Sequence, residues 1–197
     1  HRIKNSLQLA VSMLQLQAGA AKDKAVKAQL GVAASRILTI ARAHQQLYKK
    51  EEVEILDLSD YLGDVCRDLG GGGTNCAVEF DGAPGIAIAT DRAIPIALAV
   101  TELVTNVSKY AYPDVAAKRA WVRVARIPTT GDAAERIVIS VADEGVGLPR
   151  GFDAAKGKGL GMRIVSAFAS QIGATLEVRR RNPGTEFVLD LPLAAPR

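Results

Sequence analysis

The chain has 197 residues, of which 48% are hydrophobic and 23% charged, as expected of one medium folded domain or a small pair. No apolar run approaches the ~20 residues that cross a bilayer, and nothing at the start resembles a signal peptide. The net charge of +4 is uneven, because residues 1–50 carry nine Lys or Arg and one acidic residue. No basic patch is interleaved with aromatic residues, so we expect no nucleic-acid partner. Cys66 and Cys76 form neither a metal-binding pattern nor a disulfide framework.

Residues 1–50 are expected to form a helical hairpin. Apolar residues recur at spacings of three and four along the first helix, in two rows: Ile3, Leu7, Ala10 and Leu14, then Leu9, Met13 and Leu16. The stretch 18–24 favours a turn, and a second helix repeats apolar residues with heptad spacing from Val26 to Leu47. Two such helices cannot bury wide apolar faces alone. We therefore expect a four-helix bundle with a second copy, hence a homodimer through residues 1–50.

From residue 53 the chain alternates short strands and helices, which predicts an α+β fold with a mixed, mainly antiparallel sheet. Expected strands are 53–58, 76–80, 85–90, 120–127, 136–143, 175–181 and 185–192, and expected helices are 59–69, 91–113 and 158–173. Ser59 is expected to cap the first of these helices, and Pro95 fits the second only in its first turn. We place the domain boundary so that residues 1–52 form the hairpin and residues 53–197 form the second domain.

The stretch ELVTNVSKY places Glu102, Asn106 and either Lys109 or Tyr110 on one face of a helix, because they are three or four residues apart. The side-chain carbonyl of Asn106 is a neutral, hard ligand that suits magnesium bound to an anionic triphosphate. Lys109 is a candidate phosphate contact. By itself the pattern is equally that of an ordinary solvated helix face, so it needs support from other segments.

Three further stretches contain glycines. In VADEGVGLP, Asp143 ends an apolar strand, where its carboxylate can accept a hydrogen bond from an adenine amino group. Gly145 and Gly147 let the backbone approach the base closely. In GKGKGLGMRIV, glycines precede a helix whose free N-terminal amides favour phosphate. Each stretch is common as a turn or linker when it stands alone, as is NPGTEFVLDLP, where Gly184 and Thr185 begin a strand.

In this order and spacing, the four stretches resemble the nucleotide boxes of the GHKL ATPases, whose members have the Bergerat fold. Neither a Walker loop nor a Rossmann glycine pattern is present. The resemblance implies a Bergerat-type α/β sandwich that binds ATP, with Asn106 as the Mg²⁺ ligand, Asp143 as the adenine contact and residues 149–158 as a short mobile lid. It also implies further nucleotide contacts at Lys109, Gly145, Gly147, Gly159, Leu160, Gly161 and Thr185.

His1 heads the first helix in the stretch HRIKNSLQ. On a helical wheel it shares the polar face with Asn5, nearly opposite the main apolar row, whereas His44 takes a seam position and is expected to be a core histidine. Neutral imidazole offers a lone pair for in-line attack on a phosphoryl group. Arg2 and Lys4 disfavour protonation of His1 and attract phosphates, and Asn5 can orient the phosphoryl group or a water molecule.

HRIKNSLQ, the downstream RILTIARAHQQLY and the four boxes together resemble the sensor histidine kinases, in the subfamily whose phosphoacceptor box reads H-R-x-K-N, a sister group of the HWE kinases. The resemblance implies a two-component kinase core that binds Mg-ATP, autophosphorylates on His1 and passes the phosphoryl group to an aspartate of a response-regulator receiver domain. His1, Asn5 and Glu102 are the candidate catalytic residues. The expected setting is cytoplasmic, with membrane contact only through a region upstream of this sequence, if any.

Two other functions stay open. A histidine phosphotransferase with a degenerate nucleotide site would not bind ATP, and the intact Asn106, Asp143 and glycine boxes argue against it. A regulatory binding module of the GHKL type, such as an anti-sigma factor, would not carry a histidine-headed helical hairpin.

Overall fold

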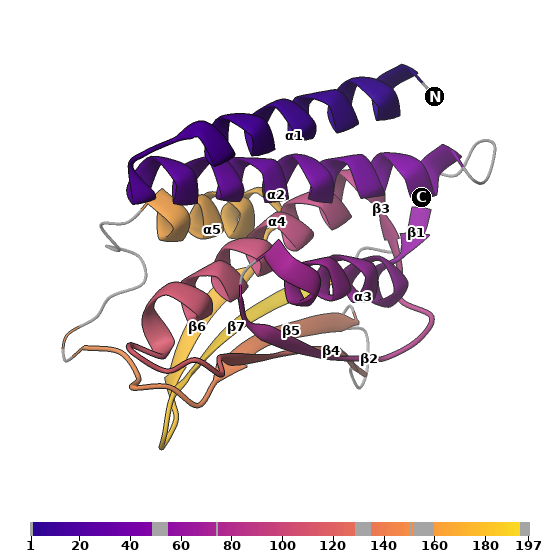
Figure 1. Cartoon of the computed structure of the whole chain (residues 1–197). Helices are drawn as coiled ribbons and strands as arrows, with labels where there is room; N and C mark the ends of the chain where they lie inside the picture. Colours follow the sequence, from indigo (N-terminus) through magenta and orange to yellow (C-terminus); the bar gives the residue numbers. More distant parts are fainter. Residues whose placement is uncertain are drawn as a thin grey trace.

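The computed structural model describes residues 2–48, 55–73, 75–128, 135–149, 151 and 160–193. Its helices are α1 (Arg2–Ala20), α2 (Lys24–Tyr48), α3 (Leu58–Asp68), α4 (Thr90–Asn106) and α5 (Leu160–Gln171), with π-helical turns η1 (Leu69–Gly73) and η2 (Val107–Ala111). Its strands are β1 (Ile55–Asp57), β2 (Ala77–Gly82), β3 (Ala87–Ala89), β4 (Arg119–Ile127), β5 (Arg136–Asp143), β6 (Thr175–Arg180) and β7 (Thr185–Pro192). Figure 1 shows three layers, namely the α1–α2 hairpin, the helices α3, α4 and α5, and the sheet. The predicted α+β class and the helical hairpin are confirmed.

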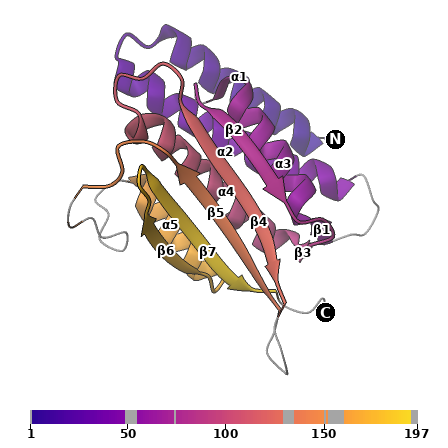
Figure 2. The same ribbon diagram turned by 90° about the horizontal axis from the view of Figure 1, so that it is seen from below.

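The main sheet has the strand order β2-β4-β5-β7-β6 (Figure 2). β2 runs parallel to β4 and the other neighbours are antiparallel, so the predicted mixed, mainly antiparallel sheet is confirmed. β1 and β3 form a separate antiparallel pair. In the register of β5 and β7, Asp143 lies opposite Thr185. The pairing therefore brings two of the predicted nucleotide contacts to one end of the sheet.

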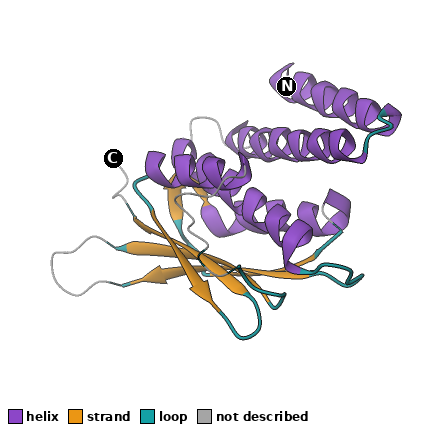
Figure 3. Cartoon of the chain, turned by 90° about the vertical axis from the view of Figure 1, so that its left-hand side faces the viewer, coloured by secondary structure: helices purple, strands orange, loops and turns teal. Residues whose placement is uncertain are grey.

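One face of the sheet is covered by helices and the other is open (Figure 3). Alternate apolar residues of the central strands point toward the helices and are buried: Ala120, Val122, Val124, Ile137, Ile139, Val141, Phe187, Leu189 and Leu191. The open face carries ion pairs between neighbouring strands, such as Arg123–Asp81 at 2.9 Å and Arg136–Asp190 at 2.8 Å. Exposed pairs of this kind add little stability, so burial of the apolar face holds the sheet to the helices.

Two local expectations are wrong. The N-cap of α3 is Asp57 rather than Ser59, because the Asp57 carboxylate accepts the backbone N–H groups of Ser59 and Asp60 at 2.8 and 3.0 Å. The Ser59 hydroxyl instead donates to the carbonyl of Ala83. Pro95 lies inside α4, in its second turn, although proline cannot donate a hydrogen bond to the preceding turn. Pro95 is buried, so tertiary packing compensates for the weakened helix.

Helix α2 docks directly on the second domain. Its Thr39 carbonyl accepts a hydrogen bond from the Tyr61 hydroxyl of α3 at 2.8 Å, and its Thr39 hydroxyl lies 3.4 Å from that of Thr101 in α4. The sheet covers the other side of α4, so polar residues of this helix such as Thr101 and Glu102 are buried. The hairpin and the second domain therefore share an interface with buried polar contacts.

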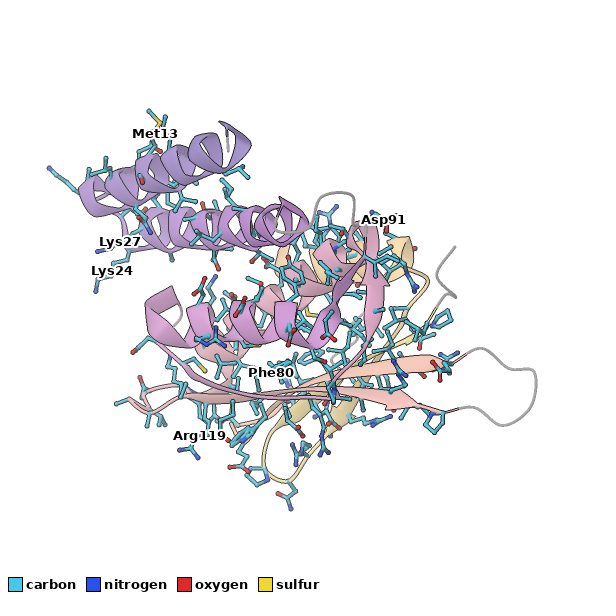
Figure 4. All side chains as sticks on the ribbon, turned by 90° about the vertical axis from the view of Figure 1, so that its right-hand side faces the viewer. Met13, Lys24, Lys27, Phe80, Asp91 and Arg119 are labelled. Carbon is cyan, nitrogen blue, oxygen red and sulfur yellow. The ribbon has the colours of Figure 1, made fainter. Side chains whose placement is uncertain are left out.

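Helix α1 has one covered and one open apolar face. Val11 is buried in the hairpin, whereas the predicted second row is open, with exposed fractions of 61% for Leu9, 58% for Met13 and 74% for Leu16. Met13 points away from the rest of the molecule (Figure 4). Among the described residues, no helix combines the length and apolar character needed to span a membrane.

Candidate functional site

A cavity of about 870 Å³ lies between α2, α4, η2, the loop after β5 and the start of α5. This volume lies within the usual range for small-molecule and cofactor sites. Its lining brings together seven of the residues predicted from separate stretches: Glu102, Asn106, Lys109, Asp143, Gly147, Gly161 and Thr185. We call the part around Asp143 and Thr185 the strand end, and the part around Glu102, Asn106 and Gly161 the helix end.

At the strand end, Asp143 is buried, with 3% of its surface exposed. Its Oδ1 accepts the backbone N–H of Gly145 at 2.8 Å. Burial raises the pKa of Asp143 above its ordinary value, and the N–H groups of Gly145 and Thr185 and the charge of Arg181 offset part of that shift. A buried carboxylate at a cavity wall is a strong acceptor for a ligand N–H group.

The loop after β5 is fastened to η2 by a backbone contact that requires glycine. The N–H of Val146 donates to the carbonyl of Ala111 at 2.9 Å. A Cβ atom at position 145 would lie 2.0 Å from that same carbonyl oxygen, which no side chain can tolerate. Gly145 therefore allows the loop to lie directly on the end of the α4–η2 segment, beside Asp143.

Tyr112, which the sequence analysis missed, holds the loop of this end although it does not itself line the cavity. Its hydroxyl donates to the carbonyl of Arg119 at 2.9 Å and accepts the N–H of Glu144 at 3.0 Å, so it bridges β4 to the loop after β5. Burial raises the pKa of the Tyr112 phenol, and the hydrogen bond from the Glu144 backbone partly offsets this. Its position just after the ELVTNVSKY stretch is a weak signal, because a tyrosine in a loop is ordinary.

At the helix end, Glu102 and Asn106 lie one turn apart on α4, as predicted, and Glu102 is buried. The first turn of α5 approaches them closely. A Cβ atom at position 161 would lie 3.1 Å from Glu102 Oε2 and 3.4 Å from Asn106 Oδ1. Gly161 thus lets the N-terminus of α5, where free amides favour anions, face the α4 side chains. Lys109 is exposed on η2 at the cavity lining.

Arg36 of α2 is a second residue that the sequence analysis missed. Its Nε lies 2.5 Å from Glu102 Oε1, across the interface between the hairpin and the second domain. Arg36 lines the cavity together with Gln29 and Val32, which lie on the same face of α2 at helical spacing. Partners 66 residues apart in the chain give no local sequence signal.

The residues at the helix end fit a magnesium ion. Asn106 Oδ1 is a neutral, hard oxygen directed toward the start of α5, and magnesium in nucleotide sites takes most of its ligands from phosphates and water. Among the described residues, no group of three or more His, Cys, Asp or Glu side chains could hold a metal ion. A ligand with its own oxygens would therefore have to complete the coordination shell of any metal bound here.

Several predicted residues lie outside what the structure describes. His1 and Gly159 are outside the described residues, as is most of the predicted lid at 149–158. The backbones of Asn5 and Leu160 are helical, but their side chains are not described. The roles of His1 and Asn5 therefore stay predictions from the sequence.

A histidine kinase family model of the HisKA_2 type matches residues 1–71, and a model of histidine kinase-, DNA gyrase B- and HSP90-like ATPases matches residues 91–195. The sensor histidine kinase PdtaS of Mycobacterium tuberculosis is 29% identical over 198 residues, which are 98% of this chain and 38% of PdtaS. The solved histidine kinase domain of the blue-light activated kinase EL346 from Erythrobacter litoralis has a TM-score of 0.70 at 24% identity, over 98% of this chain and 93% of that domain. Full-length ShkA in complex with AMPPNP has a TM-score of 0.54 at 19% identity, over 98% of this chain and 44% of ShkA.

The first family model covers the hairpin and continues through α3, the second covers the chain from α4 to β7, and the ATPase model alone covers more than half of the chain. The solved structures share the fold at low identity. The matches confirm the resemblance drawn from HRIKNSLQ and the four boxes. The chain therefore belongs to the histidine kinases, and its second part is an ATPase domain of the kind that they share with DNA gyrase B and HSP90.

Proposed function

We propose that the chain is the kinase core of a two-component sensor histidine kinase, in which the cavity binds Mg-ATP for phosphoryl transfer to His1. The observation that carries the proposal is the single cavity that gathers Glu102, Asn106, Asp143 and Gly161 beside a hairpin headed by His1 in the sequence. Binding of AMPPNP by the similar kinase ShkA supports this occupant. The division into a phosphotransfer hairpin at residues 1–52 and an ATP-binding domain at residues 53–197 is part of the proposal.

In the proposed complex, adenine lies at the strand end and the triphosphate extends to the helix end. Asp143 accepts a hydrogen bond from the adenine amino group, beside Gly145 and Thr185. Asn106 holds the magnesium ion, which neutralises charge on the phosphate oxygens when bound. The N-terminal amides of α5 and the Lys109 ammonium group face the phosphates.

The proposed reaction is in-line attack of a neutral ring nitrogen of His1 on the γ-phosphorus. A P–N bond forms as the bond to the bridging oxygen breaks, and ADP leaves. Imidazole, with an ordinary pKa of ~6.5, is mostly neutral and nucleophilic near pH 7. Asn5 orients the phosphoryl group, and the phosphohistidine then passes the group to an aspartate of a response-regulator receiver domain in the cytoplasm.

The hairpin is proposed to form a homodimer through the open row of α1. Leu9, Met13 and Leu16 are mostly exposed and recur at spacings of three and four, and Met13 points away from the ATPase domain (Figure 4). Burying that row against a second copy completes the four-helix bundle expected from the spacing of apolar residues. A monomeric chain by light scattering at micromolar concentration would contradict this part of the proposal.

The experiment that tests the activity is incubation of the chain with labelled ATP and magnesium. We expect an acid-labile, base-stable phosphoryl mark that disappears in His1→Gln and persists in His44→Gln, the matched histidine control. An undiminished mark in His1→Gln would remove the phosphoacceptor assignment. Failure of the wild-type chain to bind Mg-ATP in a titration would favour the phosphotransferase alternative, and co-purification with a sigma factor would favour a regulatory module.

A further inference from the structure

One wall of the proposed ATP site comes from the hairpin rather than from the ATPase domain. Gln29, Val32 and Arg36 of α2 line the same cavity as Asn106 and Asp143. The spacing of three and four residues places the α2 residues on one helix face, which looks into the cavity while other α2 residues pack on α1, α3 and α4. The hairpin must therefore be docked on the ATPase domain for this wall of the site to be present.

Arg36 is the charged residue on that wall. Its Nε is held by Glu102 Oε1 at 2.5 Å, and the Glu102 side chain is only 4% exposed, against 28% for Arg36. Within the part of the chain that the structure describes, no other hydrogen bond or ion pair holds the guanidinium group. Its two terminal NH₂ groups are therefore available to a ligand, in the planar arrangement that binds phosphate oxygens in pairs.

The position of Glu102 places Arg36 at the phosphate side of the site. Glu102 belongs to the helix end, beside Gly161, whereas Ala111 holds the loop of the strand end. Positions 102 and 111 lie on the continuous α4–η2 segment, so they are separated by about 13 Å at ~1.5 Å per residue. A nucleotide with its base at Asp143 reaches the helix end with its terminal phosphates.

The charges of the lining support the same placement. Among the described lining residues, the cations are Arg36 and Lys109 and the anions are Glu102 and Asp143. Without Arg36, the ATPase domain sets the one cation Lys109 against the two anions Glu102 and Asp143, so its own described lining offers no net positive charge to a triphosphate. Arg36 supplies the cation that contacts the buried Glu102 directly.

We propose that Arg36 is a nucleotide-binding residue contributed by the hairpin, whose guanidinium group, oriented by Glu102, binds the terminal phosphates of ATP. The inference rests on the proposed function and deepens it, because it makes the ATP site a composite of both parts of the chain. Nucleotide binding and docking of the hairpin then stabilise each other.

The test compares the binding of ATP with that of AMP, which has the same base but lacks the terminal phosphates. Affinities are measured by calorimetric titration of the whole chain. Where binding is too weak for calorimetry, they are measured by competition against a fluorescent ATP analogue. Arg36→Gln is expected to weaken ATP binding about tenfold or more, equivalent to ~1.4 kcal/mol, and to leave AMP binding unchanged. Arg36→Lys keeps the charge but loses the paired donors, so a smaller loss is expected. Lys27→Gln removes the same charge from an exposed position of α2 outside the cavity lining and serves as the control (Figure 4).

Each outcome separates the inference from the proposed function. Wild-type chain that fails to bind ATP removes the proposed function. Wild-type chain that binds ATP while Arg36→Gln binds it equally well, or more tightly, overturns the inference alone. Equal losses for ATP and AMP also overturn it, because they indicate a purely structural role. Thermal unfolding checks that the variants are folded, and Arg36→Lys carries the test should Arg36→Gln unfold.

Glu102 orients Arg36, so the two side chains should act as one unit. In a Glu102→Gln background, the loss of ATP affinity caused by Arg36→Gln is expected to be smaller than in the wild type. Losses that simply add would show that Arg36 acts without Glu102, which contradicts the proposed orienting contact.

Discussion

The two ends of the cavity are built by different means. The strand end lies within one domain and is fixed by backbone N–H groups of the loop after β5, since Val146 donates to the Ala111 carbonyl and Gly145 donates to the Asp143 carboxylate. The helix end depends on a side-chain ion pair between two parts of the chain, Arg36 and Glu102. The strand end is therefore set by the ATPase domain, whereas the helix end also depends on where the hairpin lies.

The largest loss of nucleotide affinity is expected from a substitution that disrupts the strand end. Gly145→Ala places a Cβ atom 2.0 Å from the carbonyl oxygen of Ala111, so the loop must move away from η2. We expect a loss of affinity of about a hundredfold or more for both ATP and AMP, since overpacking at such a site costs about 3 kcal/mol. Gly71→Ala is the control, because a Cβ there meets no atom within 4 Å. Retained AMP binding in Gly145→Ala would contradict the idea of a rigid strand end.

Asp143→Asn tests the buried carboxylate. We expect a loss of about tenfold to a hundredfold in affinity for both nucleotides, because hydrogen bonds to a charged group contribute ~1.5–3 kcal/mol. Direct titration measures the loss, and an unchanged affinity would argue against contact between Asp143 and the base.

Asp143→Asn is expected to weaken nucleotide binding but to stabilise the nucleotide-free fold near neutral pH. Burial raises the pKa of Asp143, so its contribution to the free energy of unfolding is greatest in acid and is lost as the pH rises through that raised value. Asn stays neutral throughout. The nucleotide-free variant is therefore expected to melt above the wild type near neutral pH, with a difference that shrinks as the pH falls. A difference that grows toward acid would reverse the sign assigned to this group.

Tyr112→Phe removes the hydroxyl that holds the loop of the strand end but keeps the aromatic ring. Loss of the hydroxyl leaves the Arg119 carbonyl and the Glu144 N–H without their partner, at a cost of about 1 kcal/mol. We expect ATP and AMP to lose affinity equally, by about fivefold. A loss confined to ATP would place Tyr112 in the helix end instead.

The smallest effect concerns the helix end. Gly161→Ala adds a Cβ atom 3.1 Å from Glu102 Oε2, a contact that a side chain can relieve by shifting. We expect ATP affinity to fall about threefold with AMP binding unchanged, and stability to be maintained, because Ala favours a helix over Gly by ~1 kcal/mol. Gly31→Ala on α2, where an added Cβ meets no atom within 4 Å, is the matched helix control. Equal effects on both nucleotides would remove the distinction between the two ends.

Local patterns were sufficient for most of the fold. The three-and-four spacing of apolar residues predicted α1 and α2, and the strands expected at 175–181 and 185–192 are present as β6 and β7, which pair with each other. The predicted N-cap of α3, Ser59, was wrong, because Asp57 and Ser59 are both residue types that cap helices well. Asp57 is selected by a distant partner, since its second oxygen accepts the N–H of Gly85 at 2.9 Å.

Those residues of the candidate site that lie in short sequence motifs could be predicted. Asn106, Asp143, Gly161 and Thr185 each belong to a short pattern and line one cavity. Arg36 begins the stretch RILTIARAHQQLY, which indicated the family but assigned no role to this residue. Only the docking of α2 on α4 brings it to Glu102.

The sequence by itself determined the family, the elements and the chemical identity of the nucleotide boxes, because periodicity and short motifs are properties of neighbouring residues. The tertiary structure decided which segments meet, since a contact between α2 and α4 depends on the packing of whole faces. The charge at the helix end of the cavity is therefore a property of the fold, set by how the hairpin and the ATPase domain bury their shared interface.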